Sequence, residues 1–295
     1  LPASTADTTT LESPMTWKLQ GRSFGQDQRM LQVADLAVYN MLRQNARNQW
    51  ERPMYFAVTV ARSGQLNLQN YFQLEGQAYR VLPIKHSQPL GRVVPGISDD
   101  RIQKFQFTNL ADSSAYYNEN ARRMVDGYRL HVSHTAERLA RKNHSETAQT
   151  LLDNFVADVP FSTIPGDVQT LMYTARAYRA IGDTERLASV LRKAQPVVFN
   201  DVRTAQSRRA FSRSLLFAGR IRRGLKDAGQ TEALSTFDEE LNTLLAEAPY
   251  RVPPRIRQAY GLASDTSAGS PQPPALPSGM GNPSPTSPSN GSPNN

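Results

Sequence analysis

The sequence predicts an α+β fold, with a small α/β unit over residues 15–117 and a mostly α-helical stack of hairpins over residues 118–263. Three observations support this division. Apolar and polar residues alternate over residues 54–60, long segments of helical periodicity follow residue 118, and a short pattern recurs within those segments. Residues 1–14 are rich in Thr, Ser and Ala and are interpreted as a linker. Residues 264–295 are almost wholly Ser, Pro, Gly and Asn and are expected to form a disordered tail.

The α/β unit is predicted to begin with a helix over residues 29–47. Its apolar residues recur at three- and four-residue intervals and form one stripe, made of Met30, Val33, Ala34, Ala37, Val38 and Met41. A strand should follow at Met54, after the chain-breaking Arg52-Pro53 pair, with its core-facing side formed by Met54, Phe56, Val58 and Val60. A second strand is expected over residues 79–82, and Asp99-Asp100 favour the start of a short helix.

The helical part carries an internal repeat. Ala148 and Ala188 lie 40 residues apart, each after a turn, and Pro160 and Pro196 are expected to close the two units. A small residue at this point lets two antiparallel helices approach closely, as in tetratricopeptide-like (TPR-like) hairpins. Helices over residues 203–225 and 232–246 could form a third, capping pair.

Composition excludes several classes of protein. The chain of 295 residues has no cysteine, which excludes a disulfide framework and a thiolate zinc site. It contains no long apolar run and no signal-peptide pattern, so the piece as given is expected to be soluble. A start at Leu1 without methionine suggests a fragment. The net charge of +8 favours anionic partners.

One region combines strand patterns with polar residues that strands do not need. It comprises Trp50-Glu51-Arg52-Pro53-Met54-Tyr55-Phe56-Ala57-Val58-Thr59 and Tyr71-Phe72-Gln73-Leu74-Glu75-Gly76-Gln77-Ala78-Tyr79-Arg80. With Trp17-Lys18-Leu19 and a Tyr117–Met124 segment, it resembles the soluble part of a bacterial membrane protein family known as a domain of unknown function. That family is related to GT-C type protein O-mannosyltransferases. The chain departs from the family at Met54, where a branched residue is usual, and at Asn67-Leu68, where Gly-Leu is expected.

The resemblance implies a division of labour. Members of this group resemble glycosyltransferases that use a lipid-linked sugar donor, with a catalytic acid in a loop near the membrane and a helical-repeat domain outside it. We therefore expect a domain on the extracytoplasmic, periplasmic face of a bacterial membrane, attached through an N-terminal multi-pass region. Its partners would be that membrane half, the lipid-linked donor and a protein acceptor. The resemblance places no catalytic residue in this chain.

The candidate binding residues lie in the two strand segments: Trp50, Arg52, Tyr55, Glu75, Tyr79 and Arg80. An arginine can hold a phosphate or carboxylate through two hydrogen bonds, and aromatic rings can stack on a sugar. Alternatively, Arg52 and Glu75 pair with each other to fix the two strands, and the aromatic rings belong to the core.

A second candidate is a basic surface on the helix after residue 203, formed by Arg208, Arg209, Arg213, Arg220, Arg222 and Arg223. It could contact anionic lipid headgroups or an acidic partner, or it could simply be a solvated helix face. Nucleic acid is an unlikely partner, because no aromatic residues interleave with these arginines in a binding pattern.

Other motifs carry little weight. His131, His134 and Glu137 share a helix face, but ordinary surface histidines are favoured over a metal site. No phosphate-binding loop, dinucleotide fingerprint or nucleophile elbow is present, so no cofactor is expected. Two functions from different classes therefore remain: the extracytoplasmic domain of a GT-C-like glycosyltransferase, and a non-enzymatic TPR-like scaffold that binds a protein segment.

Overall fold

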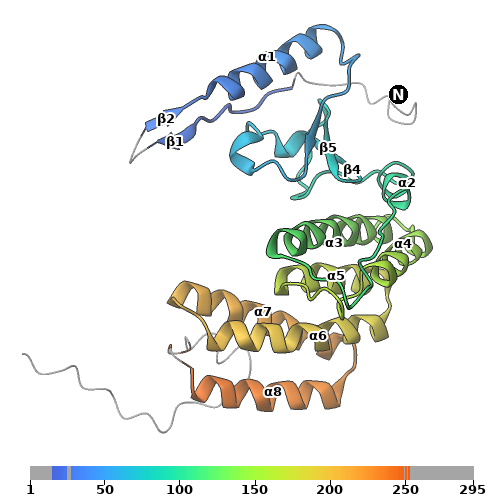
Figure 1. Ribbon diagram of the computed structural model, residues 1–295, viewed down its shortest axis with the longest axis vertical. Coiled ribbons are helices and arrows are strands. Elements are labelled where there is room, and N and C mark those ends of the chain that lie inside the picture. Colours follow the sequence, from blue (N-terminus) through green and yellow to red (C-terminus); the bar gives the residue numbers. More distant parts are fainter. Residues whose placement is uncertain (1–14, 25–27, 249, 251, 253–295) are drawn as a thin grey trace, which may run out of the picture. The chain divides into compact units, whose positions relative to one another are not determined.

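The computed structural model describes residues 15–24, 28–248, 250 and 252, all of which belong to one unit, Leu1–Val252 (Figure 1). Small antiparallel sheets occur in the N-terminal region and a stack of helices follows, as the sequence predicted. The predicted linker and the predicted disordered tail lie outside the described residues. Among the described helices, none is both long and apolar enough to cross a membrane.

In the described part of the chain, a β-hairpin precedes the first helix. Strands β1 (Arg22–Phe24) and β2 (Gln28–Met30) pair antiparallel, and helix α1 (Val33–Arg47) starts only after them. The helix start is fixed by a capping box, in which the Asp35 carboxylate accepts a hydrogen bond from the Gln32 backbone N–H at 3.0 Å. The predicted helix was therefore correct from residue 33 and wrong over residues 29–32.

Most of the apolar stripe predicted for this helix is exposed in the described structure. The exposed fractions of Met30, Val33 and Met41 are 53%, 84% and 57%. The buried side instead carries Asp35, Leu42 and Asn45. On that side the Asp35 carboxylate pairs with Arg22 at 3.0 Å and Leu42 belongs to the hydrophobic core. Val38 is partly buried against the same core, whereas the other residues of the predicted stripe are exposed.

A three-stranded antiparallel sheet forms the rest of the N-terminal region. Its order is β3 (Tyr55–Ala57), β5 (Ala78–Val81) and β4 (Phe72–Glu75). The predicted alternation is confirmed at Phe56, which is buried between exposed neighbours. The predicted strand is too long, because the Val60 N–H bonds the Ala57 carbonyl at 3.0 Å and turns the chain out of the ladder.

One hydrophobic core lies against this sheet. Phe72 stacks on Tyr79 with ring centroids 5.0 Å apart, and Phe56 packs on Phe72 at 5.3 Å. Trp17 and Trp50 are partly buried against the same cluster. Helix α2 (Ser98–Gln103) then follows, starting beside Asp99-Asp100 as predicted.

The helical part forms antiparallel hairpins (Figure 1). Its elements are α3 (Glu119–Ala140), α4 (Ser145–Asp158), α5 (Val168–Ile181), α6 (Thr184–Arg203), α7 (Arg208–Asp227) and α8 (Thr231–Ala246). Ala148 and Ala188 are fully buried at the helix contacts, as the repeat predicted. Pro160 follows the end of α4, but Pro196 lies inside α6. The helix continues past Pro196 because Val198, Phe199 and Val202 beyond it are buried.

Helix α3 is joined to the N-terminal sheet by two histidines that were expected at the surface. His131 Nε2 lies 3.0 Å from the Tyr79 hydroxyl, and His134 Nε2 lies 3.2 Å from the Gly91 carbonyl oxygen. Both side chains are buried, as is Glu137. They are one turn apart, so they face the sheet together and serve as buried polar contacts rather than as solvated side chains.

Candidate functional site

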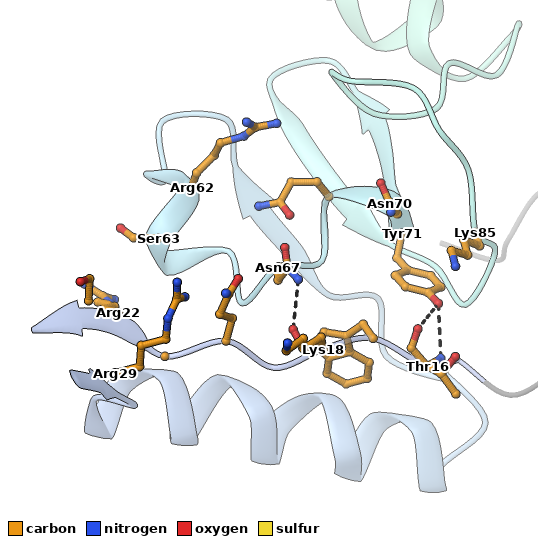
Figure 2. Close-up of a pocket in the computed structure, with 15 residues that line it drawn as sticks. Thr16, Lys18, Arg22, Arg29, Arg62, Ser63, Asn67, Asn70, Tyr71 and Lys85 are labelled. Carbon is orange, nitrogen blue, oxygen red and sulfur yellow. Dashed lines mark hydrogen bonds between the residues drawn. The ribbon is translucent and has the colours of Figure 1, made fainter. Parts of the chain in front are cut away.

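The main candidate site is a polar pocket of about 600 Å³ between the segment that follows residue 15 and the segment that precedes β4. Figure 2 shows Arg22 and Arg29 at the end beside the β1–β2 hairpin, and Thr16 and Lys85 toward the other end. Arg62 and Ser63 come from the short helix η2 (Arg62–Gly64), and Asn70 and Tyr71 come from η3 (Gln69–Tyr71). The site is thus assembled from five short segments.

Its lining is strongly cationic. Five basic residues and no acidic residue line the pocket: Lys18, Arg22, Arg29, Arg62 and Lys85. Arg22 is neutralised by Asp35, which lies 3.0 Å away and does not line the pocket. Within the described residues, Lys18, Arg62 and Lys85 form no ion pair, so their charge is available to an anion.

Two contacts hold the pocket walls at a fixed separation (Figure 2). The Tyr71 hydroxyl donates to the Thr16 carbonyl at 2.6 Å and accepts from the Thr16 N–H at 3.3 Å. The Asn67 side-chain amide donates to the Lys18 carbonyl at 3.0 Å. Asn67 has φ of +63°, a left-handed conformation that asparagine and glycine adopt readily. Asparagine can therefore replace the glycine that the family pattern led us to expect here.

The loop that carries Lys85 is also fixed. The His86 N–H bonds the Asn70 carbonyl at 2.9 Å, and His86 Nε2 lies 2.6 Å from the Phe72 carbonyl oxygen. Because a carbonyl can only accept, Nε2 carries the proton, and Nδ1 accepts from the Gln88 N–H at 3.1 Å. Burial lowers the pKa of His86. The neutral ring therefore stabilises this side of the pocket at neutral pH.

The remaining lining suits a hydroxyl-rich molecule that carries an anion. Side-chain amides and a hydroxyl, which can bond sugar hydroxyls, come from Gln20, Ser63, Asn67, Gln69 and Asn70. Trp17 and Tyr71 add aromatic surface to the same lining. Lysine and arginine side chains around such donors are the usual partners of phosphate.

The residues that the sequence suggested for binding lie elsewhere, and three of them meet on the sheet. Glu75 accepts hydrogen bonds from the Tyr55 hydroxyl at 3.0 Å and the Gln73 amide at 2.8 Å, and it lies 3.6 Å from Arg80. These side chains come together because Tyr55 and Gln73 are both register partners of Arg80. Burial and the Glu75 carboxylate raise the pKa of Tyr55.

The other three suggested residues are separated from this cluster. Arg52 is exposed and does not pair with Glu75, so the alternative ion pair is not formed. Trp50 packs against the core. Tyr79 is buried between Phe72 and His131, and burial raises its pKa to about 12. None of the six lines the cationic pocket.

The predicted basic surface of α7 divides into separate parts. Arg222 donates two hydrogen bonds to Asp238 of α8, at 2.7 and 2.8 Å, and so belongs to the α7–α8 contact. Arg208, Arg209 and Arg213 are exposed. Arg220 and Arg223 line a second pocket, described below. In the described part of the chain, no three side chains are grouped in a way that could hold a metal ion.

The match to a known protein family covers the segment that forms the first pocket. Residues 4–100 match the family model of TMEM260-associated domain 2. This domain is linked to a family of membrane proteins, and the match covers about a third of the chain. Every residue that lines the cationic pocket falls inside the matched segment. Searches of curated proteins and of solved structures gave no match.

Sequence reasoning missed this pocket because its basic residues do not form a run. They are spread from Lys18 to Lys85, whereas six arginines of α7 fall within one predicted helix of the sequence. The one available signal was Trp17-Lys18-Leu19, which contributed to the family resemblance and of which Trp17 and Lys18 line the pocket.

Proposed function

We propose that this chain is the extracytoplasmic domain of a membrane glycosyltransferase-like protein of the GT-C type, and that its cationic pocket holds the phosphate-sugar head of a lipid-linked donor. The observation that carries the proposal is the pocket lined by five basic and no acidic residues, placed within a segment that matches a membrane-protein-associated domain. The lining amides would bond the sugar, and the basic residues would bond the phosphate. The reaction itself would take place in the membrane half.

The proposal gives each group a specific task. Lys18, Arg62 and Lys85 supply charge that no described carboxylate neutralises. The Tyr71–Thr16 and Asn67–Lys18 contacts keep the site preformed, which limits the entropy lost when a flexible ligand binds. The domain would thus orient the donor, or retain its phosphate product, without a catalytic residue of its own.

Tryptophan fluorescence can test this directly. The chain has two tryptophans, of which only Trp17 lines the pocket. In a Trp50→Phe background, inorganic pyrophosphate and a water-soluble short-chain prenyl phosphate hexose are titrated at low salt. We expect saturable quenching by both, with tighter binding of the prenyl phosphate hexose because it also engages the amides.

The charge reversal R62E/K85E should weaken binding by at least about 10-fold, since each charged hydrogen bond contributes roughly 1.5 kcal/mol or more. The matched control R208E/R209E changes the net charge equally outside the pocket and should leave the affinity unchanged. Absence of quenching at millimolar concentration would refute the proposal. Equal weakening by both double variants would show that only the overall charge matters, and would refute it as well.

A further inference from the structure

A second pocket, of about 560 Å³, lies among the helices of the stack. It is lined by residues from the end of α3 and from α5, α6 and α7: Arg141, Met172, Ala175, Arg176, Arg179, Ala180, Leu187, Leu191, Arg220, Arg223 and Gly224. The residues are of two kinds only. Five are arginines, and the rest are apolar side chains or glycine.

The apolar residues form the buried floor. Met172 and Ala175 of α5 and Leu187 and Leu191 of α6 are each at most 8% exposed. Gly224 of α7 allows a close approach, because a Cβ atom there would lie 2.6 Å from Leu191 Cδ1. The floor is therefore set by tight helix packing rather than by flexible side chains.

The five arginines are exposed around this floor. Their spacing places them there, since Arg176 and Arg179 lie three residues apart on α5 and Arg220 and Arg223 lie three apart on α7. Helix α6 packs against both of these helices. We call this surface, defined by the five arginines and the apolar floor, the arginine groove.

The positive charge of the arginine groove is only partly neutralised. Arg141 and Arg176 share one carboxylate, that of Glu137, at 3.1 and 2.8 Å. Arg179 pairs with Asp227 at 2.7 Å. Arg220 lies over the Phe217 ring at 5.3 Å. Within the described residues, Arg220 and Arg223 have no acidic partner, so five positive charges face two negative ones.

We propose that the arginine groove binds an acidic polypeptide segment that also carries apolar side chains. Carboxylates of the segment pair with the arginines, whose planar guanidinium groups can form two parallel hydrogen bonds. An apolar side chain of the segment contacts Met172 and Ala180 in the lining. This inference does not depend on the phosphate-sugar pocket, which lies on other residues.

The combination of features favours a peptide over other anions. A phosphate-sugar head has no apolar group to cover the floor. A flat lipid surface contacts the most exposed residues of a helix, whereas the floor residues are buried at the bottom of the arginine groove. A polypeptide segment supplies both carboxylates and apolar side chains along one extended strand or helix.

Fluorescence anisotropy of a labelled peptide tests the proposal on the full chain. The probe is a 12-residue peptide with alternating pairs of glutamate and leucine, and the comparison peptide replaces each glutamate with lysine. We expect the acidic peptide to bind, with an affinity that falls as salt increases, and the lysine peptide not to bind.

The variant R220E/R223E should weaken binding of the acidic peptide by about 10- to 100-fold, because it reverses the two charges that no carboxylate neutralises. The milder R220A/R223A variant should weaken it less, and circular dichroism checks that both remain folded. R208E/R209E, on the same helix, and R62E/K85E, in the other pocket, should bind the peptide normally.

Three results would overturn the inference. The first is no peptide binding at millimolar concentration and low salt. The second is equal loss in R208E/R209E, which would mean that α7 attracts anions generally. The third is binding of anionic phosphatidylglycerol vesicles that R220E/R223E abolishes while peptide binding persists, which would assign these arginines to a lipid surface. Because R62E/K85E tests the other pocket, failure of either proposal can be recognised separately.

Discussion

Stability should fall when the pH is lowered from 7.5 to 5.0, and His131 should account for a defined part of the loss. Its Nδ1 lies 2.7 Å from the Gly127 carbonyl oxygen and its Nε2 lies 3.0 Å from the Tyr79 hydroxyl. Because a carbonyl can only accept, Nδ1 carries the proton and Nε2 accepts from Tyr79. A second proton on Nε2 would remove that acceptor in a site that is 5% exposed. Burial accordingly lowers the pKa of His131 to about 4.

The sign and size of the effect follow from linkage. The unfolded chain binds a proton near pH 6.5, whereas the folded chain resists protonation until about pH 4. The contribution of His131 is therefore fully present above pH 6.5 and is lost as the pH falls toward 4. Between pH 7.5 and 5.0 the free energy of unfolding should decrease by about 2 kcal/mol through this residue. Burial lowers the pKa of His134 as well, and this adds to the loss in the same direction.

Urea unfolding followed by circular dichroism, at constant ionic strength, measures the contribution of His131 to the pH dependence of stability. His131→Gln cannot titrate, so the stability advantage of the wild type over this variant should shrink by about 2 kcal/mol from pH 7.5 to 5.0. His134 is present in both proteins and cancels. His144→Gln, which replaces a histidine at an exposed position, is the matched control substitution. If His131→Gln loses as much stability on acidification as the wild type, the buried neutral histidine is not the cause.

Three further substitutions test the packing. Arg129→Met should lower the free energy of unfolding in urea by about 3–5 kcal/mol. The buried guanidinium donates to the Ile164 carbonyl at 2.6 Å and pairs with Asp126 at 3.3 Å, and the substitution removes both contacts. A loss below about 1 kcal/mol would contradict this. Gly91→Ala should cost about 1–3 kcal/mol, because φ is +86° and the new Cβ would lie 3.2 Å from the Tyr79 ring; an unchanged midpoint would argue against the close contact. Met41→Gln should change stability by less than about 0.5 kcal/mol, because Met41 is 57% exposed. A larger loss would mean that the side chain is covered.

The helical part could be predicted well because its signals are local. Buried small residues such as Ala148 and Ala188, and a turn with Gly182 at φ +92°, mark the hairpins within short stretches of sequence. The prediction at Pro196 was wrong. A proline usually ends a helix, but here the helix continues, because the burial of Phe199 beyond Pro196 offsets the lost backbone hydrogen bond. The resemblance to tetratricopeptide hairpins stays a prediction.

The N-terminal region was harder to predict because its structure depends on distant contacts. Helix α1 shows a clear apolar stripe, but its buried side carries Leu42 of the core and Asp35, which pairs with Arg22. Periodicity alone cannot reveal such a pairing across the β1–β2 hairpin. Likewise, the surface positions expected for His131 and His134 were wrong because their hydrogen-bond partners, the Tyr79 hydroxyl and the Gly91 carbonyl, come from another part of the chain.

The sequence gives the net charge of the chain but not the places where unpaired charges lie. The net charge of +8 predicted anionic partners but no location. In the structure some cations are neutralised within the fold, as Arg222 is by Asp238. Others remain without a described carboxylate, and some of these line the two pockets: Arg62 and Lys85 lie among amide groups in the cationic pocket, and Arg220 and Arg223 lie beside the apolar floor of the arginine groove. The cationic pocket surrounds its charges with amide groups, whereas the arginine groove surrounds them with apolar side chains. The two sites therefore suit different ligands, a phosphate-sugar and an acidic peptide. R62E/K85E should weaken binding of the prenyl phosphate hexose alone, and R220E/R223E should weaken binding of the acidic peptide alone. A surface that attracts anions only through its overall charge would not separate the two ligands in this way.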